Sequence, residues 1–344
     1  MERGPNLNVV GKINDKVKDE IRQDNHNNLH KQLEQLTDDQ RVDVLEHECP
    51  KSPEELICID LANQETNRLL ELSGVESYDF PATNVHIFDE YFIKEQYGSD
   101  FETGRAYAEG QSIILSEDEV RNNKIGFASI VFHEMFHVKS LFVQHAVRKQ
   151  EEDETFKTRI TTYRKGLLVC SPQPKHDDEN EEHVHFAGLN EAVTAQAEKI
   201  FFGKLLNNQL FADERKKLYS EEVVAFKSEL FKDKGITEDE IIFVSDKNNG
   251  KREYLRIGYA KQREVLEYVC REIAQDLGVS EEEVFNKFVK SQFNGHLVEL
   301  GNMIEKSFGK GSFRRLGDMP RGQDYGPETL EALRKMRLQI LKAR

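Results

Sequence analysis

The sequence predicts an α+β fold in which a few strands precede a mainly helical C-terminal part. Two observations lead to this prediction: strand-like segments gather between residues 84 and 170, and the last third of the chain shows helical periodicity with capping signals. Strands and helices do not alternate strictly, which favours α+β over α/β. A chain of 344 residues is long enough for a large domain, or two, with a real core.

The composition is typical of a globular protein with a well-solvated surface. Apolar residues make up 38%, charged residues 32%, and the formal net charge is −15. This acidic balance argues against nucleic acid as a main partner, because phosphate-binding surfaces need clustered Lys and Arg. The first thirty residues lack the apolar core of a signal peptide, and the apolar runs are far shorter than the ~20 residues of a membrane span. Four cysteines without CxxC spacing favour reduced thiols. We therefore expect a soluble, cytoplasmic protein with no membrane partner.

The elements before the central motif are expected as follows. Residues 1–50 are very polar, which predicts an extension that is partly disordered or helical, with an amphipathic helix over 29–48. A helix is predicted over 53–72 and is expected to stop at Gly74. The residues expected on its buried side are Leu56, Leu61, Leu69 and Leu70. Strand-like segments follow over 84–93 and 104–116.

The later elements are expected from their periodicity and caps. A helix is predicted over 124–147, a strand over 158–170, an acidic loop over 171–185 and a helix over 189–206. Asn248, Asn249 and Gly250 suggest a hairpin. A helix is predicted over 259–277. A second helix begins after a cap made by Ser280 and Glu283, and a last helix follows Pro327. The chain thus divides into an extension (1–50), a first subdomain (53–207) and a mainly helical subdomain (208–344).

The stretch FASIVFHEMFHVKSLF, from Phe127 to Phe142, places two histidines and a glutamate in an apolar helix. His133 and His137 are four residues apart and lie on one helical face, so both imidazoles can bind one ion. Glu134 lies about 100° around the axis, beside the ion. The helix is apolar nearly all round and is therefore predicted to be buried, where a metal would satisfy these polar groups. The pattern predicts a zinc site in which Glu134 takes a proton from a zinc-bound water.

A catalytic zinc takes three protein ligands and keeps one position open. The nearby third histidine of the extended H-E-x-x-H-x-x-G-x-x-H motif is absent, because Ser140 and Val143 occupy its Gly and His positions. Glu191, in GLNEAVTAQAEKI, is the better candidate, and Glu198 is the runner-up. An acid in the first turn of a helix is also common for reasons of the helix dipole. His183 and His185 follow an acidic run, and we expect both in a solvated loop.

The combination of HEMFH with a later helix carrying Asn-Glu-Ala-Val-Thr resembles the gluzincin clan of zinc metallopeptidases. The resemblance covers roughly residues 53–316, but only these two motifs are specific. It implies a zincin-like architecture: a small twisted sheet, an active-site helix, a glutamate helix beside it and a helical C-terminal subdomain. It also implies one Zn²⁺ held by His133, His137 and Glu191, with Glu134 as general base. The interval between His137 and Glu191 is long for the compact members of the clan.

Two further expectations concern the substrate, a peptide or protein. Residues 110–115 fit the edge strand of such a sheet, where an extended peptide can pair. A donor for the developing oxyanion is also needed, and Tyr259 is the first candidate, followed by Tyr254, Tyr163 and His296.

Two other functions stay open. One is a non-catalytic zinc-binding module with a regulatory or binding role; the presence of Glu134 favours the enzyme, because a scaffold needs no base. The other is a zinc hydrolase acting on a non-peptide bond, such as a deformylase, which pairs its motif with an upstream Cys ligand. Cys49 and Cys58 fit that role poorly. The ligand set would also hold cobalt, manganese or nickel.

Overall fold

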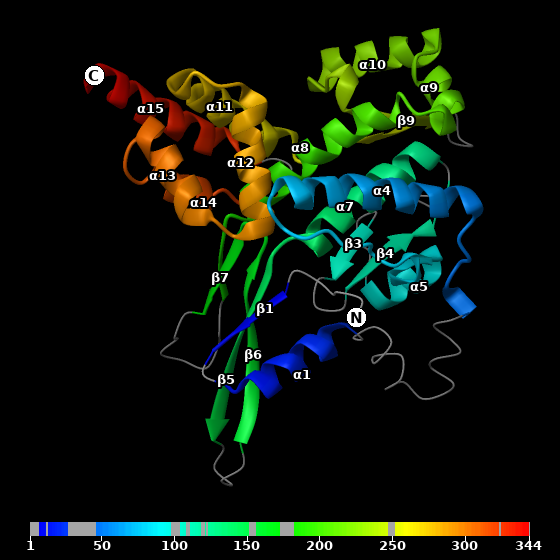
Figure 1. Ribbon diagram of the computed structural model, residues 1–344. Helices are drawn as coiled ribbons and strands as arrows, with labels where there is room; N and C mark the ends of the chain where they lie inside the picture. The colour runs from blue at the N-terminus through cyan, green and yellow to red at the C-terminus, as the bar shows by residue number, and fades with distance from the viewer. Residues whose placement is uncertain are drawn as a thin grey trace.

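The computed structural model describes residues 7–11, 13–26, 46–97, 104–107, 111–117, 121, 123–150, 156–172, 182–246, 252–322 and 325–343. In this part of the chain the protein is α+β, as predicted, with small mixed sheets and many helices (Figure 1). Most of the predicted helix, 29–45, and the centre of the predicted acidic loop, 173–181, lie outside the described residues, whereas both ends of that loop are strand rather than loop.

A three-stranded sheet and two helices form the part of the fold that carries the histidine motif. β4 (Ser112–Ser116) lies in the middle, parallel to β2 (Val85–Phe88) and antiparallel to β3 (Gly104–Tyr107). Helix α7 (Lys124–Lys139) packs against β3 and β4, and α4 (Pro53–Leu72) packs along α7. The sheet therefore supports one side of the motif helix.

A second sheet continues directly from the end of α7. Its strand order is β1-β5-β6-β7-β8, comprising Leu7–Val10, Phe142–Gln150, Phe156–Lys165, Leu168–Pro172 and Glu182–His185. The hairpin of β5 and β6 extends away from the body of the molecule, with α1 (Asp15–His26) alongside it (Figure 1). Ile21 of α1 is buried with Phe142 and Ala146 of β5. The second sheet thus joins the N-terminal segment to the region of α7.

The C-terminal part is mainly helical. Its helices are α8 (Ala187–Leu205), α9 (Ala212–Leu218), α10 (Glu221–Lys234), α11 (Ala260–Leu277), α12 (Glu281–Asn294), α13 (Leu297–Phe308), α14 (Ser312–Gly317) and α15 (Pro327–Ala343). The hairpin β9 (Ile241–Asp246) and β10 (Arg252–Arg256) lies among them. A continuous buried apolar cluster runs from Cys58 in α4 to Leu333 in α15. This shared core fixes α8 and the C-terminal helices against α7.

Several expectations about elements are corrected. The motif helix ends at Lys139 rather than Val147, because the β-branched residues after Ser140 enter β5. The segment 158–170 is two strands with a turn at Gly166, whose φ of +60° favours glycine. Only 85–88 of the segment 84–93 is strand, and α5 (Glu90–Tyr97) follows it; the segment 104–116 forms two strands.

The buried face of α4 also differs from the prediction. The helix has the expected bounds and a capping box between Ser52 and Glu55. Leu56, however, is 41% exposed, whereas Asn63 and Thr66 are buried. Asn63 hydrogen-bonds the backbone of Phe80 and Thr66 bonds back to its own helix, so both polar groups are satisfied inside.

Candidate metal centre

Helix α7 presents the two histidines toward α8. Asn123 caps its first turn by accepting a hydrogen bond from the Gly126 N–H at 2.8 Å. The Ser140 hydroxyl donates to the Phe136 carbonyl at 2.7 Å at the other end. Most of the helix is buried, yet His133, Glu134 and His137 keep partial exposure. The three polar side chains of the motif are therefore in part accessible to solvent, on a helix that is otherwise mainly buried.

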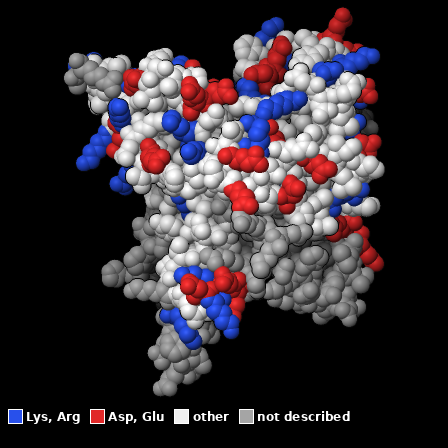
Figure 2. All heavy atoms as spheres, viewed as in Figure 1, with Lys and Arg blue, Asp and Glu red and all other residues white. Residues whose placement is uncertain are grey.

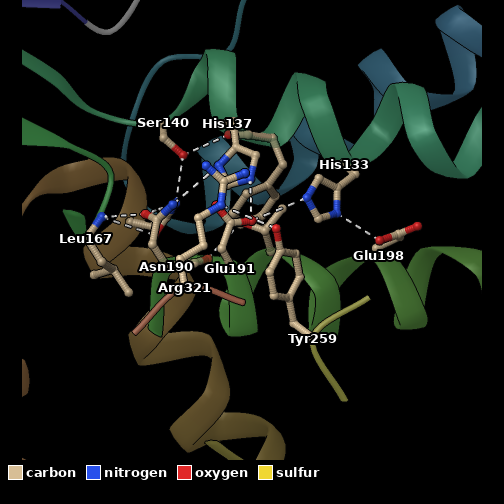
Figure 3. A network of polar contacts seen from close by, with 12 residues as sticks. His133, His137, Ser140, Leu167, Asn190, Glu191, Glu198, Tyr259 and Arg321 are labelled. Atoms are coloured by element: carbon tan, nitrogen blue, oxygen red, sulfur yellow. Dashed lines mark hydrogen bonds and ion pairs between the residues drawn. The ribbon is translucent and has the colours of Figure 1, made fainter. Parts of the chain in front are cut away.

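Helix α8 brings Glu191 to the histidines. Glu191 lies in the first turns of this helix and is only 5% exposed. Its Oε2 atom lies 3.3 Å from His137 Nε2 and 3.6 Å from His133 Nε2. Possible ligand atoms of His133, His137 and Glu191 all lie within 4.8 Å of one another. The three residues are close enough to bind one metal ion (Figure 3).

Glu198, the runner-up for the third metal ligand, instead contacts the second ring nitrogen of His133. It is 5% exposed, and its Oε2 lies 2.8 Å from His133 Nδ1, while Oε1 accepts from the Ser129 hydroxyl at 2.8 Å. A carboxylate accepts, so the proton of the neutral ring lies on Nδ1 and leaves the Nε2 lone pair for a metal. Glu198 thus lies behind His133, on the opposite side from Glu191. The seven-residue spacing from Glu191, two helical turns, is the sequence signal for this shared face.

His137 is held from its other side by Asn190. The Asn190 amide nitrogen lies 3.4 Å from His137 Nδ1, and its oxygen accepts from Gln292 Nε2 at 2.9 Å and from the Leu167 N–H at 3.0 Å. These contacts connect α8, α12 and the turn between β6 and β7. A Cβ on Gly166 in that turn would lie 2.4 Å from Gln292 Nε2, so the turn packs directly on this network. The sequence analysis included Asn190 in the motif without a role, and it missed Gln292, because only the fold brings α12 to this place.

Electrostatics favour an anionic Glu191 facing cationic or metal-bound groups. Burial alone would raise the pKa of Glu191, but His137, His133 and Arg321 hold it well below its usual range. Burial alone would lower the pKa of His133, but the hydrogen bonds to Glu191 and Glu198 raise it well above its usual range. Burial raises the pKa of Glu134.

The donor set can hold one metal ion. Two imidazole nitrogens and one carboxylate form one of the known three-ligand sets that leave a fourth position open. Glu198 matches the usual requirement that a ligating histidine donate its second N–H to an acceptor, whereas Asn190 faces Nδ1 of His137 with its amide nitrogen, which is a donor. Among the described residues, the group that can hold a metal consists of two histidines and a glutamate and contains no cysteine.

Tyr259 lies beside the metal centre. Its ring stacks on that of His133 with centroids 6.4 Å apart, and the Arg321 Nε donates to its hydroxyl at 3.4 Å. Tyr259 adopts a left-handed conformation with φ of +56°, unfavourable for a non-glycine residue. The buried Arg263 supports this turn by donating to the Gly258 carbonyl at 3.0 Å.

The other candidate donors have partners elsewhere. Tyr254 accepts from Lys234 at 3.3 Å, His296 lies 3.8 Å from Glu299, and Tyr163 is 48% exposed on β6. Nothing places these side chains at the metal centre. His185 lies in strand β8, not in a loop, and its Nδ1 is 3.7 Å from Asp318.

Arg321 is a site residue that sequence reasoning missed. Its Nε lies 3.4 Å from Glu191 Oε1, on the side of the carboxylate that does not face the histidines (Figure 3). It belongs to the segment after α14, remote in sequence from both motifs, and no local pattern marks it. Arg321 brings a positive charge to the edge of the centre.

In comparisons with known proteins, no family model matches the chain, and neither the curated proteins nor the solved structures gave a match. No helix among the described residues is long and apolar enough to cross a membrane. The geometry of His133, His137 and Glu191 is therefore the observation that points to a function.

Proposed function

We propose that this chain is a zinc-dependent metallopeptidase of gluzincin type, in which Glu134 is the general base. One observation carries the proposal: α7 and α8 bring His133, His137 and Glu191 within metal-binding distance, and Glu134 stands next to the first ligand. A zinc ion bound there would supply a Lewis acid that polarises a carbonyl and makes water more acidic.

Glu134 has the position and environment of a base that works at neutral pH. As the neighbour of His133 on α7, it lies about 100° around the helix axis, beside the ligand face. Burial raises its pKa, which brings the carboxylate closer to the pH at which it must both accept and release a proton. In the proposed reaction Glu134 takes a proton from the attacking water and passes it to the departing amine.

Tyr259 is proposed as the donor to the developing oxyanion. Its stacking on His133 keeps the phenol beside the ligand set, and its hydroxyl is already held by Arg321. A donor aimed at the charge that forms in the transition state contributes without reorganisation.

The substrate strand is proposed to pair with β3. The expectation that residues 110–115 form the edge is wrong, because β4 is paired on both sides, by β2 and β3. β3 has β4 as its neighbour in the sheet and packs on α7. A Cβ on Gly104 of β3 would lie 3.3 Å from Glu134 Cγ, so this strand passes directly beside the base. An extended peptide along β3 would therefore run past Glu134.

The test is cleavage of a mixed peptide library, followed by mass spectrometry, with zinc-loaded wild type and Glu134→Gln. Glu282→Gln, on the exposed surface of α12, is the matched control. We expect cleavage by wild type and the control, a loss of about 10²- to 10⁴-fold in Glu134→Gln, and equal zinc content in all three. One zinc per chain without cleavage of any peptide would instead favour the non-catalytic zinc-binding module. Cleavage of non-peptide esters or amides alone would favour the other hydrolase.

A further inference from the structure

The segment Lys306–Gly322 has a charge opposite to that of the chain. It contains five basic residues and one acidic residue, a net charge of +4, whereas the whole chain carries −15. The rest of the chain therefore carries −19. The five basic side chains are all exposed and form what we call the basic face: Lys306, Lys310, Arg314, Arg315 and Arg321. In Figure 2, Lys and Arg side chains are prominent over the C-terminal helices at the upper left, the region of α13 to α15 in Figure 1.

Much of this positive charge is not neutralised by ion pairs among the described residues. In the part of the chain that the structure describes, Lys310, Arg314 and Arg315 have no carboxylate within ion-pair distance. The acid of the segment, Asp318, faces His185 at 3.7 Å. By contrast, Arg337 on the neighbouring α15 is buried and bonds Asp276 and Glu272, as a structural arginine does. Lys310, Arg314 and Arg315 of the basic face are therefore available to a negatively charged partner.

The basic face is fixed next to the metal centre. The Phe186 N–H donates to the Gly317 carbonyl at 2.7 Å, and the Gly188 N–H donates to the Met319 carbonyl at 3.0 Å. A Cβ on Gly188 would lie 2.5 Å from the Pro320 carbonyl oxygen, so the two backbones are in direct contact. These bonds hold α14 and the following turn against the start of α8, less than one helical turn from Glu191.

Arg321 continues the basic face into the centre. Its guanidinium reaches Glu191 and the Tyr259 hydroxyl, yet the side chain is 63% exposed. One residue therefore belongs both to the metal centre and to the solvent-exposed basic face. A ligand lying on Arg314 and Arg315 would lie on the same segment of the chain that carries Arg321 to Glu191.

We infer that the basic face recognises an acidic segment of the polypeptide substrate and directs it to the metal centre. The inference rests on the proposed peptidase function and adds the substrate class. A chain of net charge −15 repels an acidic polypeptide at long range, so attraction at a local basic surface makes the encounter selective and oriented. Because the side chains are exposed, the attraction is screened over about 8–10 Å in salt.

The test is peptide binding to zinc-loaded Glu134→Gln, measured by fluorescence anisotropy, because this variant separates binding from cleavage. The probe is a fluorescein-labelled twelve-residue peptide of alternating Glu and Ser, compared with its Gln and Ser counterpart. The test variant is R314E/R315E; the matched control is K216E/K217E on α9, an exposed basic pair with the same change in net charge. Each double variant is made in the Glu134→Gln background.

We expect the acidic peptide to bind at least about tenfold more tightly than its neutral counterpart at low salt. R314E/R315E should remove that preference, the control should keep it within about twofold, and 300 mM salt should reduce it strongly. Equal losses in both double variants would show a mere effect of net charge and overturn the inference. Equal competition by a twelve-nucleotide single-stranded DNA would overturn it too, because the surface would then bind any polyanion.

The two proposals fail in different ways. Selective binding of the acidic peptide without any cleavage by wild type would overturn the peptidase and with it the substrate role of this surface. Cleavage by wild type of neutral and acidic peptides at equal kcat/KM would leave the peptidase intact and overturn the inference about the basic face.

Discussion

Replacing Glu198 by alanine tests how the fold prepares His133 for a metal. The carboxylate makes two short contacts, 2.8 Å from His133 Nδ1 and 2.8 Å from the Ser129 hydroxyl, in a place where it is 5% exposed. Alanine removes both acceptors. His133 is then free to rotate or to place its proton on Nε2, and either change removes the lone pair that a metal needs.

The expected magnitude follows from these contacts. Loss of a carboxylate that orients a ligating histidine costs about 10- to 100-fold in metal affinity, which is about 1.4–2.7 kcal/mol. Glu198→Gln keeps the size and one acceptor oxygen but loses the charge, so we expect a loss of about tenfold or less. Ser129→Ala is the matched control, because it removes the second contact and leaves His133 held; its effect should be below about threefold.

The assay is a competition titration of zinc against a chromophoric chelator, with circular dichroism melting curves to verify that each variant is folded. Glu198→Ala with wild-type zinc affinity would refute the orienting role. Complete loss of zinc in Glu198→Ala, together with retention in Glu191→Ala, would show that Glu198 is itself the ligand.

Three further predictions address other contacts. Tyr259→Phe keeps the ring on His133 but loses the hydroxyl, so kcat should fall about 10²- to 10³-fold with KM nearly unchanged. A rise in KM with kcat unchanged would contradict the role of the hydroxyl in the transition state. Gly188→Ala places a Cβ 2.5 Å from the Pro320 oxygen and should cost about 1–3 kcal/mol in the free energy of unfolding, measured by urea titration, whereas Gly203→Ala, with open space around its Cβ, should cost nothing. Glu65 joins α4 to Lys204 of α8, and although burial alone would raise its pKa, Arg68 and Lys204 lower it below the ordinary value of 4.5. Its ion pairs therefore stabilise the fold above about pH 4.5 and lose this effect as the pH falls through the lowered pKa. Glu65→Gln should lower the free energy of unfolding by roughly 1 kcal/mol at pH 7 and by progressively less below pH 4.5. A loss of stability that does not depend on pH would contradict this role of Glu65.

The sequence predicted which three side chains come close enough to hold a metal ion, because local spacing carries part of that information. His133 and His137 share a helical face by their four-residue interval, and Glu191 comes within reach because its helix packs beside theirs. Helix bounds with explicit signals were predicted well: α4 and α11 begin and end within a residue of the expected positions, and α12 begins directly after the predicted cap at Ser280. The antiparallel pairing of β9 and β10 confirms the predicted hairpin, whose turn residues lie outside the described part.

The remaining features depend on contacts between distant segments. The end of α7 at Lys139 is set by the entry of Phe142 into the second sheet, and the central place of β4 is set by pairing with β2. Arg321 and Gln292 reach the metal centre only because α12 and the turn after α14 pack on α8. Such contacts have no signature in local periodicity.

The central claim is that His133, His137 and Glu191 together bind one metal ion. The most direct test is to load purified wild type and Glu191→Ala with zinc, remove the excess, and measure the metal content by inductively coupled plasma mass spectrometry. We predict about one zinc per wild-type chain and much less than one in Glu191→Ala, with both proteins folded by circular dichroism. Folded wild type without zinc or another divalent metal, or equal metal in both proteins, would contradict a centre formed by His133, His137 and Glu191.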